Sequence, residues 1–247
     1  MNDHVATVML STLDEQHFGI RTARATGVTA LSLPMLLHFC ETNTVELLIA
    51  RCSTYDLDAT QAMERHGFAL MDTLLYFTHD LQHILYTSQP GALRVRSIRP
   101  AEADTVQAIA RAAFRCYHSH YHADPRLDPL ASDEVYAEWA YQAARSRTVA
   151  DEVLVAELNG AIVGFGTLRL SNDTTVEGGL FAVCPTARRQ GVYRSIMIHA
   201  LEWCTTRGAS QMLISTQVTN LASQKVWTRL AFEPCDSFYT FHKWFTQ

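Results

Sequence analysis

One stretch of the chain combines a strand, a turn and a basic helix start, which together could bind an anion. VEGGLFAV (176–183) has the pattern of a strand, Pro185 marks a turn, and RRQG (188–191) opens a helix. The first N–H groups of a helix have no partners within it, and the helix dipole favours an anion there. Gly191 would let a phosphate approach the backbone closely, and the arginines add charge. The stretch predicts a pyrophosphate site; the alternative is an ordinary helix start with exposed arginines.

A second stretch, HSHYHADP (118–125), gathers polar and aromatic side chains. Such a mixture suits a sugar or a nucleotide base. Its alternating histidines also allow a metal site, because neutral imidazole is a common metal ligand. No carboxylate or cysteine set completes such a site, so we expect no metal. A polar loop without a function is the remaining alternative.

The elements that position these stretches follow from hydrophobic spacing and from turn residues. Asn159 and Gly160 give the strongest hairpin signal, between strands at 152–158 and 161–170. Ser132 is expected to cap one helix and Asn220 another. The other predicted elements are strands at 93–98, 176–183, 211–216 and 238–245, a helix after Pro100, and a helix from Arg188 to about Arg207 that ends at Gly208.

The chain is predicted to have two parts. The polar break SQPG (88–91) indicates a boundary near residue 90, which gives domains at 1–90 and 91–247. The second part has the order β-α-α-β-β-β-α-β-α-β, so we expect an α+β layered sandwich.

The first part carries a looser copy of the end of the second. At one fixed offset, which lays Asp56 over Asn220, the segment 36–77 lies over 200–241 without a gap. We therefore predict a degenerate half-domain at the N-terminus, with chance similarity as the alternative.

The composition argues against several classes of partner. A net charge of -5 and a pI near 6.1 do not favour a nucleic acid or an anionic membrane. The start of the chain lacks the features of a secretion signal, and the longest apolar run, at 30–40, is interrupted by Pro34 and too short to span a bilayer. The six cysteines are scattered singly, as in a reducing compartment. We expect a cytoplasmic protein that binds neither nucleic acid nor membrane.

The segment RRQGVY (188–193) resembles the R/Q-x-x-G-x-G/A acetyl-coenzyme A loop of the GNAT N-acetyltransferases. It stands in that family's order, after VEGGLFAV and before TQVTNLASQKVWTRLAF (216–232). The resemblance implies a GNAT fold with a mixed, centrally antiparallel sheet and acetyl-CoA as cosubstrate. Tyr193 departs from the pattern, and its side chain is expected to point away from the phosphates. The implied cofactor-binding residues are Leu180, Phe181, Ala182, Val183, Arg188, Arg189, Gln190, Gly191, Val192, Tyr193 and Asn220.

A narrower resemblance covers nearly the whole chain. STLDEQHFGI (11–20) and the segment 114–146 are similar to the dTDP-fucosamine acetyltransferase group, which places a degenerate half-domain before a GNAT domain. That group acetylates the 4-amino group of a nucleotide-linked 4-amino-4,6-dideoxy sugar for a surface polysaccharide. The acceptor-side residues implied are Tyr117, His118, His120, Tyr121, Asp124, Arg126 and Gln217.

The implied reaction is direct attack of a neutral amine on the thioester. Glu177 resembles the carboxylate that often serves as base in GNAT enzymes, an exposed strand carboxylate being the alternative, and backbone N–H groups around 181–183 would hold the oxyanion. Where the family usually has a proton-donating tyrosine, this chain has Trp227. An indole donates a hydrogen bond but delivers no proton at accessible pH. Three solutions remain open: Trp227 stabilises the thiolate, Tyr239 donates the proton, or solvent does.

The leading hypothesis is an N-acetyltransferase that moves an acetyl group from acetyl-CoA to the amino group of a dTDP-linked 4-amino-4,6-dideoxy sugar. The alternatives are a GNAT enzyme for another small amine and a catalytically weak acetyl-CoA-binding sensor or partner protein. The terminal strand at 238–245 is expected at a sheet edge, where it could pair with a second copy in a homodimer.

Overall fold

The computed structural model describes residues 6–83, 93–115 and 117–245. The predicted boundary near residue 90 lies outside the described residues, and the division into 1–90 and 91–247 stays a prediction. Within the described ranges, no helix is long and apolar enough to cross a membrane.

The fold is built on one open sheet of ten strands in the order β1-β2-β3-β10-β4-β9-β8-β7-β6-β5. Two neighbouring pairs, β2 with β3 and β8 with β9, are parallel, and the other pairs are antiparallel. The expected mixed, largely antiparallel sheet is confirmed. The strands are β1 (Thr7–Leu10), β2 (Thr22–Thr26), β3 (Leu47–Ser53), β4 (Ala69–Asp80), β5 (Leu93–Ser97), β6 (Glu152–Leu158), β7 (Ala161–Leu170), β8 (Thr175–Val183), β9 (Gln211–Gln217) and β10 (Glu233–Trp244).

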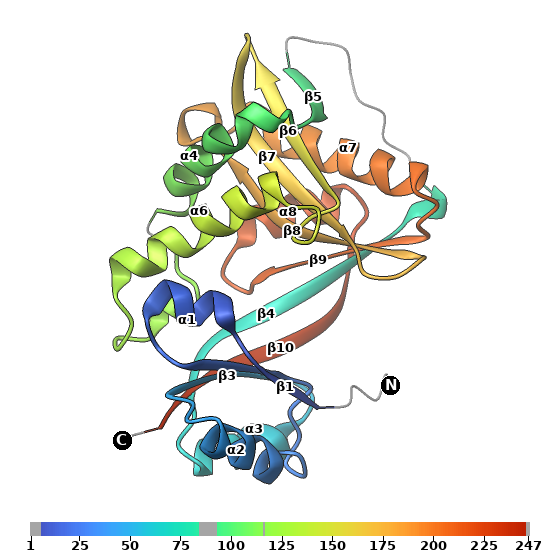
Figure 1. Ribbon diagram of the computed structural model, residues 1–247. Coiled ribbons are helices and arrows are strands. Elements are labelled where there is room, and N and C mark those ends of the chain that lie inside the picture. Colours follow the sequence, from blue (N-terminus) through green and yellow to red (C-terminus); the bar gives the residue numbers. More distant parts are fainter. Residues whose placement is uncertain (1–5, 84–92, 116, 246–247) are drawn as a thin grey trace.

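Helices cover this sheet in layers (Figure 1). In the C-terminal half of the sequence (93–115 and 117–245), α4 and α6 pack together on one face of the sheet, and α7 packs on the other against β6, β7, β8 and β9. In the N-terminal half (6–83), α2 and α3 lie together below β3 (Figure 1). The helices are α1 (Thr12–Phe18), α2 (Leu33–Thr42), α3 (Leu57–Arg65), α4 (Ala103–Phe114), α5 (His120–Ala123), α6 (Pro129–Arg145), α7 (Val192–Thr206) and α8 (Leu221–Arg229).

The predicted repeat is visible in the structure at the predicted offset. When Asp56 is laid over Asn220, both ends of β3, α3 and β4 coincide with those of β9, α8 and β10, respectively. The helix caps also correspond, because Asp56 accepts a hydrogen bond from the N–H of Ala59 and Asn220 from that of Ser223. The local structure of the two segments is therefore the same, element by element.

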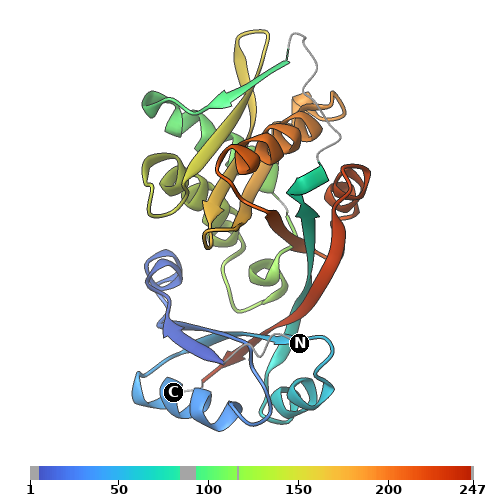
Figure 2. The same cartoon turned by 90° about the vertical axis from the view of Figure 1, so that its right-hand side faces the viewer.

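The two copies exchange their last strands. β4, from the first copy, pairs with β9 of the second, and β10, from the second copy, pairs with β3 of the first. The registers match as well: Phe77 faces Ile214, and Phe241, the counterpart of Phe77 in the second copy, faces Ala50. The long strands β4 and β10 run side by side and join the two halves of the molecule (Figures 1 and 2).

Two sequence predictions, the edge position of the last strand and the cap at Ser132, need correction. β10 lies between β3 and β4, so it is no edge strand and cannot pair with a second copy in a homodimer. The helix expected to be capped by Ser132 begins earlier, at Pro129, because Asp128 caps it by accepting from the N–H of Leu130 at 2.9 Å. Ser132 lies inside that helix.

A third prediction also needs correction, because the helix expected from Arg188 begins only at Val192. Arg189 and Gly191 have φ angles of 64° and 78°, which lie in the left-handed region and are incompatible with a right-handed helix. The hairpin at Asn159 and Gly160 is confirmed, with φ angles of 52° and 81° that match a type I′ turn.

Candidate active site

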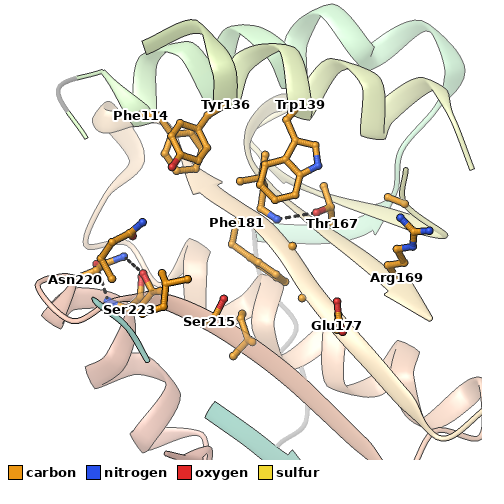
Figure 3. Close-up of a pocket in the computed structure, with 18 of the residues that line it drawn as sticks. Phe114, Tyr136, Trp139, Thr167, Arg169, Glu177, Phe181, Ser215, Asn220 and Ser223 are labelled. Atoms are coloured by element: carbon orange, nitrogen blue, oxygen red, sulfur yellow. Dashed lines mark hydrogen bonds between the residues drawn. The ribbon is translucent and has the colours of Figure 1, made fainter. Parts of the chain in front are cut away.

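A gap opens in the sheet where β8 and β9 separate. Their ladder pairs only Thr175–Gly178 with Gln211–Ile214, although β8 continues to Val183 and β9 to Gln217. The gap belongs to a cavity of about 520 Å³. Phe181 on β8 and Ser215 on β9 line it from either side (Figure 3).

The gap exposes backbone donors of β8. The N–H of Leu180 donates to Thr167 Oγ1 and that of Cys184 to the carbonyl of Val163, both at 2.8 Å and both on the β7 side. Since successive N–H groups of a strand point to opposite edges, those of Phe181 and Val183 point toward the gap. The N–H groups of Leu180 and Ala182 therefore face β7 and not a ligand in the gap.

Aromatic side chains form one wall of the cavity. Phe114 from α4 and Tyr136 and Trp139 from α6 point into it (Figure 3). The rings of Phe114 and Tyr136 stack with centroids 4.7 Å apart. Tyr117 lies edge-on to both rings and donates a hydrogen bond from its hydroxyl to Gln217 Oε1.

Two aromatic residues meet beside the gap. The indole Nε1–H of Trp227, a buried residue, donates to Tyr193 Oη at 3.0 Å. Both side chains line the cavity, as does Ser223. Burial raises the pKa of Tyr193 to about 12, although hydrogen bonding with Ser223 and Trp227 acts in the opposite direction. The phenol is therefore protonated near neutral pH.

Asn220 has the structural role expected of it. Its Oδ1 caps α8, and its Nδ2 donates to Thr216 Oγ1 at 2.8 Å. It also lines the cavity, at the same end as Ser223 in Figure 3. Glu177 and Arg169 lie at the other end (Figure 3), opposite each other on β8 and β7.

The basic loop lies outside the cavity lining but adjoins Tyr193. Arg188, Arg189, Gln190 and Gly191 are exposed, and Gly191 precedes the first turn of α7. Among the described residues, no acceptor is recorded for the backbone N–H groups of 189–192. Together with the dipole of a 15-residue helix, these N–H groups fit an anion.

The N-terminal half contributes two arginines to the cavity. Arg51 on β3 is held by a hydrogen bond from its Nε to Thr240 Oγ1 at 3.3 Å, and no further partner is recorded for its guanidinium among the described residues. Arg24 on β2 forms a bidentate ion pair with the buried Asp14, at 2.5 and 2.9 Å. Tyr121 joins this pair by accepting from Arg24 and donating to Asp14 Oδ1.

A chain of buried polar groups continues from the cavity into the protein. His120, which lines the cavity, is hydrogen-bonded through Nδ1 to Nε2 of His242 at 2.9 Å. Nδ1 of His242 lies 2.7 Å from Asp124 Oδ2, and Trp244 donates to the same oxygen at 2.8 Å. Burial opposes the ionised form of Asp124, but the hydrogen bonds from His242 and Trp244 outweigh it and lower the pKa of this carboxyl group.

The structure brings together about half of the predicted site residues. Those that line the cavity are Glu177, Leu180, Phe181, Tyr193, Asn220, Trp227, Tyr117, His120, Tyr121 and Gln217. Ala182, Val183 and Val192 do not line it; Ala182 is buried, Val183 is half-buried, and Val192 is buried at the start of α7. His118 and Arg126 are exposed outside the cavity, and the Arg126 guanidinium lies 4.1 Å from the ring centroid of Trp244.

Tyr239 is not brought to the cavity. It lies on β10, where it packs against the core of the N-terminal half, with Phe241 as a ring neighbour. The three alternating histidines also separate: His118 is exposed, His120 lines the cavity, and His122 contacts Ser119 and Asp133. In the described part of the chain, no cluster of three His, Cys, Asp or Glu could hold a metal ion.

Sequence reasoning missed Arg24, Arg51, Tyr136, Trp139 and His242. Tyr136 and Trp139 lie within a segment that was linked to the acceptor, at the spacing of one helix face, so that signal was available. Arg24 and Arg51 lie far before the acceptor loop in the chain, and no local pattern distinguishes them from other strand arginines.

Comparison with known proteins places the chain in a family. Residues 107–232, just over half of the chain, match the model of the acetyltransferase (GNAT) family. The dTDP-fucosamine acetyltransferase of Escherichia coli is 28% identical over 222 residues, which cover 89% of this chain and 90% of that protein. The spore coat polysaccharide biosynthesis protein SpsD of Bacillus subtilis is 24% identical over 159 residues, 64% of this chain, and the match spans about half of that relative's length, 53%.

Among solved structures, a GCN5-related N-acetyltransferase from Sphaerobacter thermophilus has the same fold. Its TM-score is 0.67 at 14% identity, with 97% of this chain and 76% of that chain covered. The family match, the named relatives and the shared fold lead to one conclusion: the chain belongs to the acetyltransferase (GNAT) family and is an acyl-CoA-dependent N-acetyltransferase.

Proposed function

We propose that this enzyme transfers an acetyl group from acetyl-CoA to the amino group of a dTDP-linked 4-amino-4,6-dideoxy sugar. One observation carries the proposal: a single cavity joins the gap between β8 and β9 to aromatic side chains from α4 and α6 and to Arg24 and Arg51 of the N-terminal half. Similarity to the E. coli enzyme over nearly the full length of both chains supports the same acceptor class.

The donor end of the cavity is the gap between β8 and β9. In this proposal the pyrophosphate of acetyl-CoA lies at the N–H groups of 189–192, and the pantetheine arm follows the free edge of β8. The N–H groups of Phe181 and Val183 point to that edge and are the candidates for holding the carbonyl oxygen as it becomes an oxyanion. Such donors are preorganised, because the β7 side of β8 fixes the strand.

The acceptor end combines flat and charged surfaces. Stacked Phe114 and Tyr136 offer faces for a base or a sugar ring, and aromatic walls of this kind are common in ligand pockets. Arg51 offers a guanidinium for the diphosphate that links nucleotide and sugar. A nucleotide sugar supplies both a ring system and a diphosphate, whereas a simple small amine lacks both.

Tyr193 is the candidate for the group that stabilises the departing sulfur. It is a hydroxyl beside the gap, and Trp227 donates to its oxygen, which leaves its own proton free to point elsewhere. A pKa of about 12 exceeds that of a thiol, so the phenol would stabilise a thiolate by hydrogen bonding, with solvent supplying the proton afterwards. In this scheme Trp227 orients Tyr193, and Tyr239 has no part.

Steady-state thiol release with acetyl-CoA and a panel of amines tests the proposal. Turnover of a dTDP-4-amino-4,6-dideoxy sugar, with a kcat/KM well above those for the free amino sugar and for unrelated amines, is the expected result. Preference for an amine without a nucleotide would move the acceptor to another class. Tight acetyl-CoA binding with no turnover of any amine would instead support a sensor or partner protein.

A further inference from the structure

The chain of His120, His242 and Asp124 has only one arrangement of protons when both imidazoles are neutral. An ionised Asp124 only accepts hydrogen bonds, so the hydrogen lies on Nδ1 of His242. A neutral imidazole then has an unprotonated Nε2, which must accept from Nδ1–H of His120. Nε2 of His120 is left as a bare acceptor.

That bare nitrogen is available to a ligand. His120 lines the cavity, and in the described part of the chain no hydrogen-bond partner of its Nε2 is recorded. Among the described residues, the side-chain atoms that are fully buried and lack a hydrogen-bond partner belong to Asp72 and His79. Nε2 of His120 is not one of them, which is consistent with a nitrogen that is accessible from the cavity. The ring itself is fixed, because Tyr121 lies against it with centroids 3.9 Å apart.

We propose that Nε2 of His120 accepts the proton of the attacking amine, with His242 and Asp124 as positioning residues that hold its tautomer. This inference rests on the proposed function only in requiring an amine acceptor; it does not depend on which sugar carries the amine. No part of the sequence pattern assigned the role, because His242 is 122 residues from His120.

The proposed step balances in atoms and charge. The lone pair of the neutral amine forms the C–N bond at the thioester carbonyl carbon, the tetrahedral intermediate collapses, and the C–S bond breaks with its electron pair on sulfur. The N–H proton of the new ammonium centre goes to Nε2 of His120. The products are the N-acetyl amine and a coenzyme A thiolate; His120 then releases its proton to solvent, and the thiolate takes one from solvent.

Neighbouring charges explain why the relay is needed. Burial lowers the pKa of His120 well below its ordinary value, and repulsion from the guanidinium groups of Arg24 and Arg51 lowers it further. An isolated His120 in this setting would be a poor base. A proton accepted at Nε2 can be compensated by transfer of the Nδ1 proton to His242, which then carries the positive charge beside the Asp124 carboxylate. A bound acceptor phosphate near Arg51 would reduce the repulsion as well.

The first test measures the tautomer in the free protein and needs no acceptor. In ¹⁵N-histidine NMR spectra at neutral pH, His120 is expected to show a protonated Nδ1 and an unprotonated Nε2. In His242→Gln this preference is expected to weaken, and circular dichroism checks that the variant is folded. A protonated Nε2 in the wild-type protein would overturn the proposal.

The second test uses whichever amine the wild-type enzyme turns over. His120→Gln is expected to lower kcat/KM by about 100-fold or more, as for other general bases, with little change in acetyl-CoA affinity. His122→Gln is the matched control, because it removes an imidazole from the same helix that does not line the cavity. Equal rates for the two variants would refute the assignment. A large loss in Glu177→Gln alone would assign the base to Glu177 and refute it too.

Failure of the proposed function would look different. If only amines without a nucleotide are substrates, the sugar assignment fails while both tests of His120 still apply.

Asp124→Asn is a further variant, which tests the positioning role of the carboxylate. Oδ1 of Asp124 accepts from the N–H of Arg126 at 3.0 Å, and Oδ2 accepts from His242 and Trp244. An amide must turn its NH₂ toward one of these donors, so a loss of kcat between those of His122→Gln and His120→Gln is expected.

Discussion

The indole of Trp227 and the phenol of Tyr193 form one hydrogen-bonded pair, with 3.0 Å between Nε1 and Oη. The first lies on α8 and the second on α7, and both line the cavity. An indole nitrogen only donates, so the phenol oxygen is the acceptor and its own hydrogen points away from Trp227. Trp227 stands where the GNAT family usually has a tyrosine, and Tyr193 on α7 supplies a tyrosine hydroxyl next to it.

This pair leads to a rescue experiment. Tyr193→Phe is expected to lower kcat by about 10- to 100-fold, because one hydrogen bond to a developing thiolate is lost. Trp227→Tyr alone is expected to change the rate little, since the hydroxyl is already supplied. In the Tyr193→Phe background the same substitution is expected to restore much of the loss. Thiol release measures all three.

Leaving-group dependence provides the control for this experiment. An acetyl thioester whose thiol is more acidic than coenzyme A needs less stabilisation, so Tyr193→Phe should affect it less. Tyr239→Phe removes a phenol that packs against the N-terminal core and should leave the rate unchanged. A loss in Tyr239→Phe equal to that in Tyr193→Phe would contradict the assignment.

Arg51 allows a test of acceptor recognition by the N-terminal half. Arg51→Gln is expected to raise KM for a nucleotide-linked sugar by about 10- to 100-fold, since a charge-assisted contact to the diphosphate is lost. The KM for the free amino sugar should not change. Arg65→Gln removes the same charge from the exposed end of α3 and is the matched control. An equal effect on both acceptors would show that Arg51 does not contact the diphosphate.

The ion pair between Asp14 and Arg24 links stability to pH. Burial disfavours the charged carboxylate, but hydrogen bonds and charge from Arg24, with Ser11 and Tyr121, lower the pKa of Asp14 below its ordinary value. A carboxyl group with a lowered folded-state pKa stabilises the fold above its unfolded pKa, and this stability is lost as the pH falls through the lower folded value. The contribution is therefore complete near neutral pH, begins to decline near pH 4, and is lost once the pH is below the folded-state pKa.

Asp14→Asn tests this linkage. It leaves Arg24 without its charge partner and should cost roughly 3 kcal/mol at pH 7, the lower end for a broken buried pair, because the Arg24 side chain is 34% exposed. The difference from wild type should shrink as the pH falls from 4 to 2. Asp14→Asn with Arg24→Met should cost less than Asp14→Asn alone. Urea unfolding at several pH values measures each free energy; a constant difference at every pH would exclude the linkage.

Much of the fold could be predicted because its signals are local. Asn159 and Gly160 specify their own turn, Asn220 caps its own helix, and the two copies of the repeat share one register over helix, strand, helix and strand. The strand exchange has no local signal. Either copy could have kept its own last strand with the same side-chain pattern, so β10 was expected at an edge and is found in the interior.

The site was predictable only where its parts are adjacent in sequence. Phe181, Asn220 and Trp227 belong to continuous segments, and all three line the cavity. Contacts between distant elements leave no recognisable sequence pattern. His120 is hydrogen-bonded to His242, 122 residues away, and Trp227 to Tyr193, 34 residues away. These contacts decide the protonation and orientation of the polar groups, which is why the sequence left the acid and the base open.

The exchange of β4 and β10 predicts that the two halves unfold together. Phe77, from the first copy, is buried in the core beneath α7, and Phe241, from the second copy, is buried in the core of the N-terminal half. Phe77→Ala and Phe241→Ala should each destabilise the protein by about 3–5 kcal/mol, the usual cost of such a cavity. Because each core contains a strand of the other copy, either substitution should shift one common thermal transition. Calorimetry would show this as a single peak at a lower temperature; two peaks, of which each substitution moves only one, would mean that the halves fold independently despite the exchanged strands.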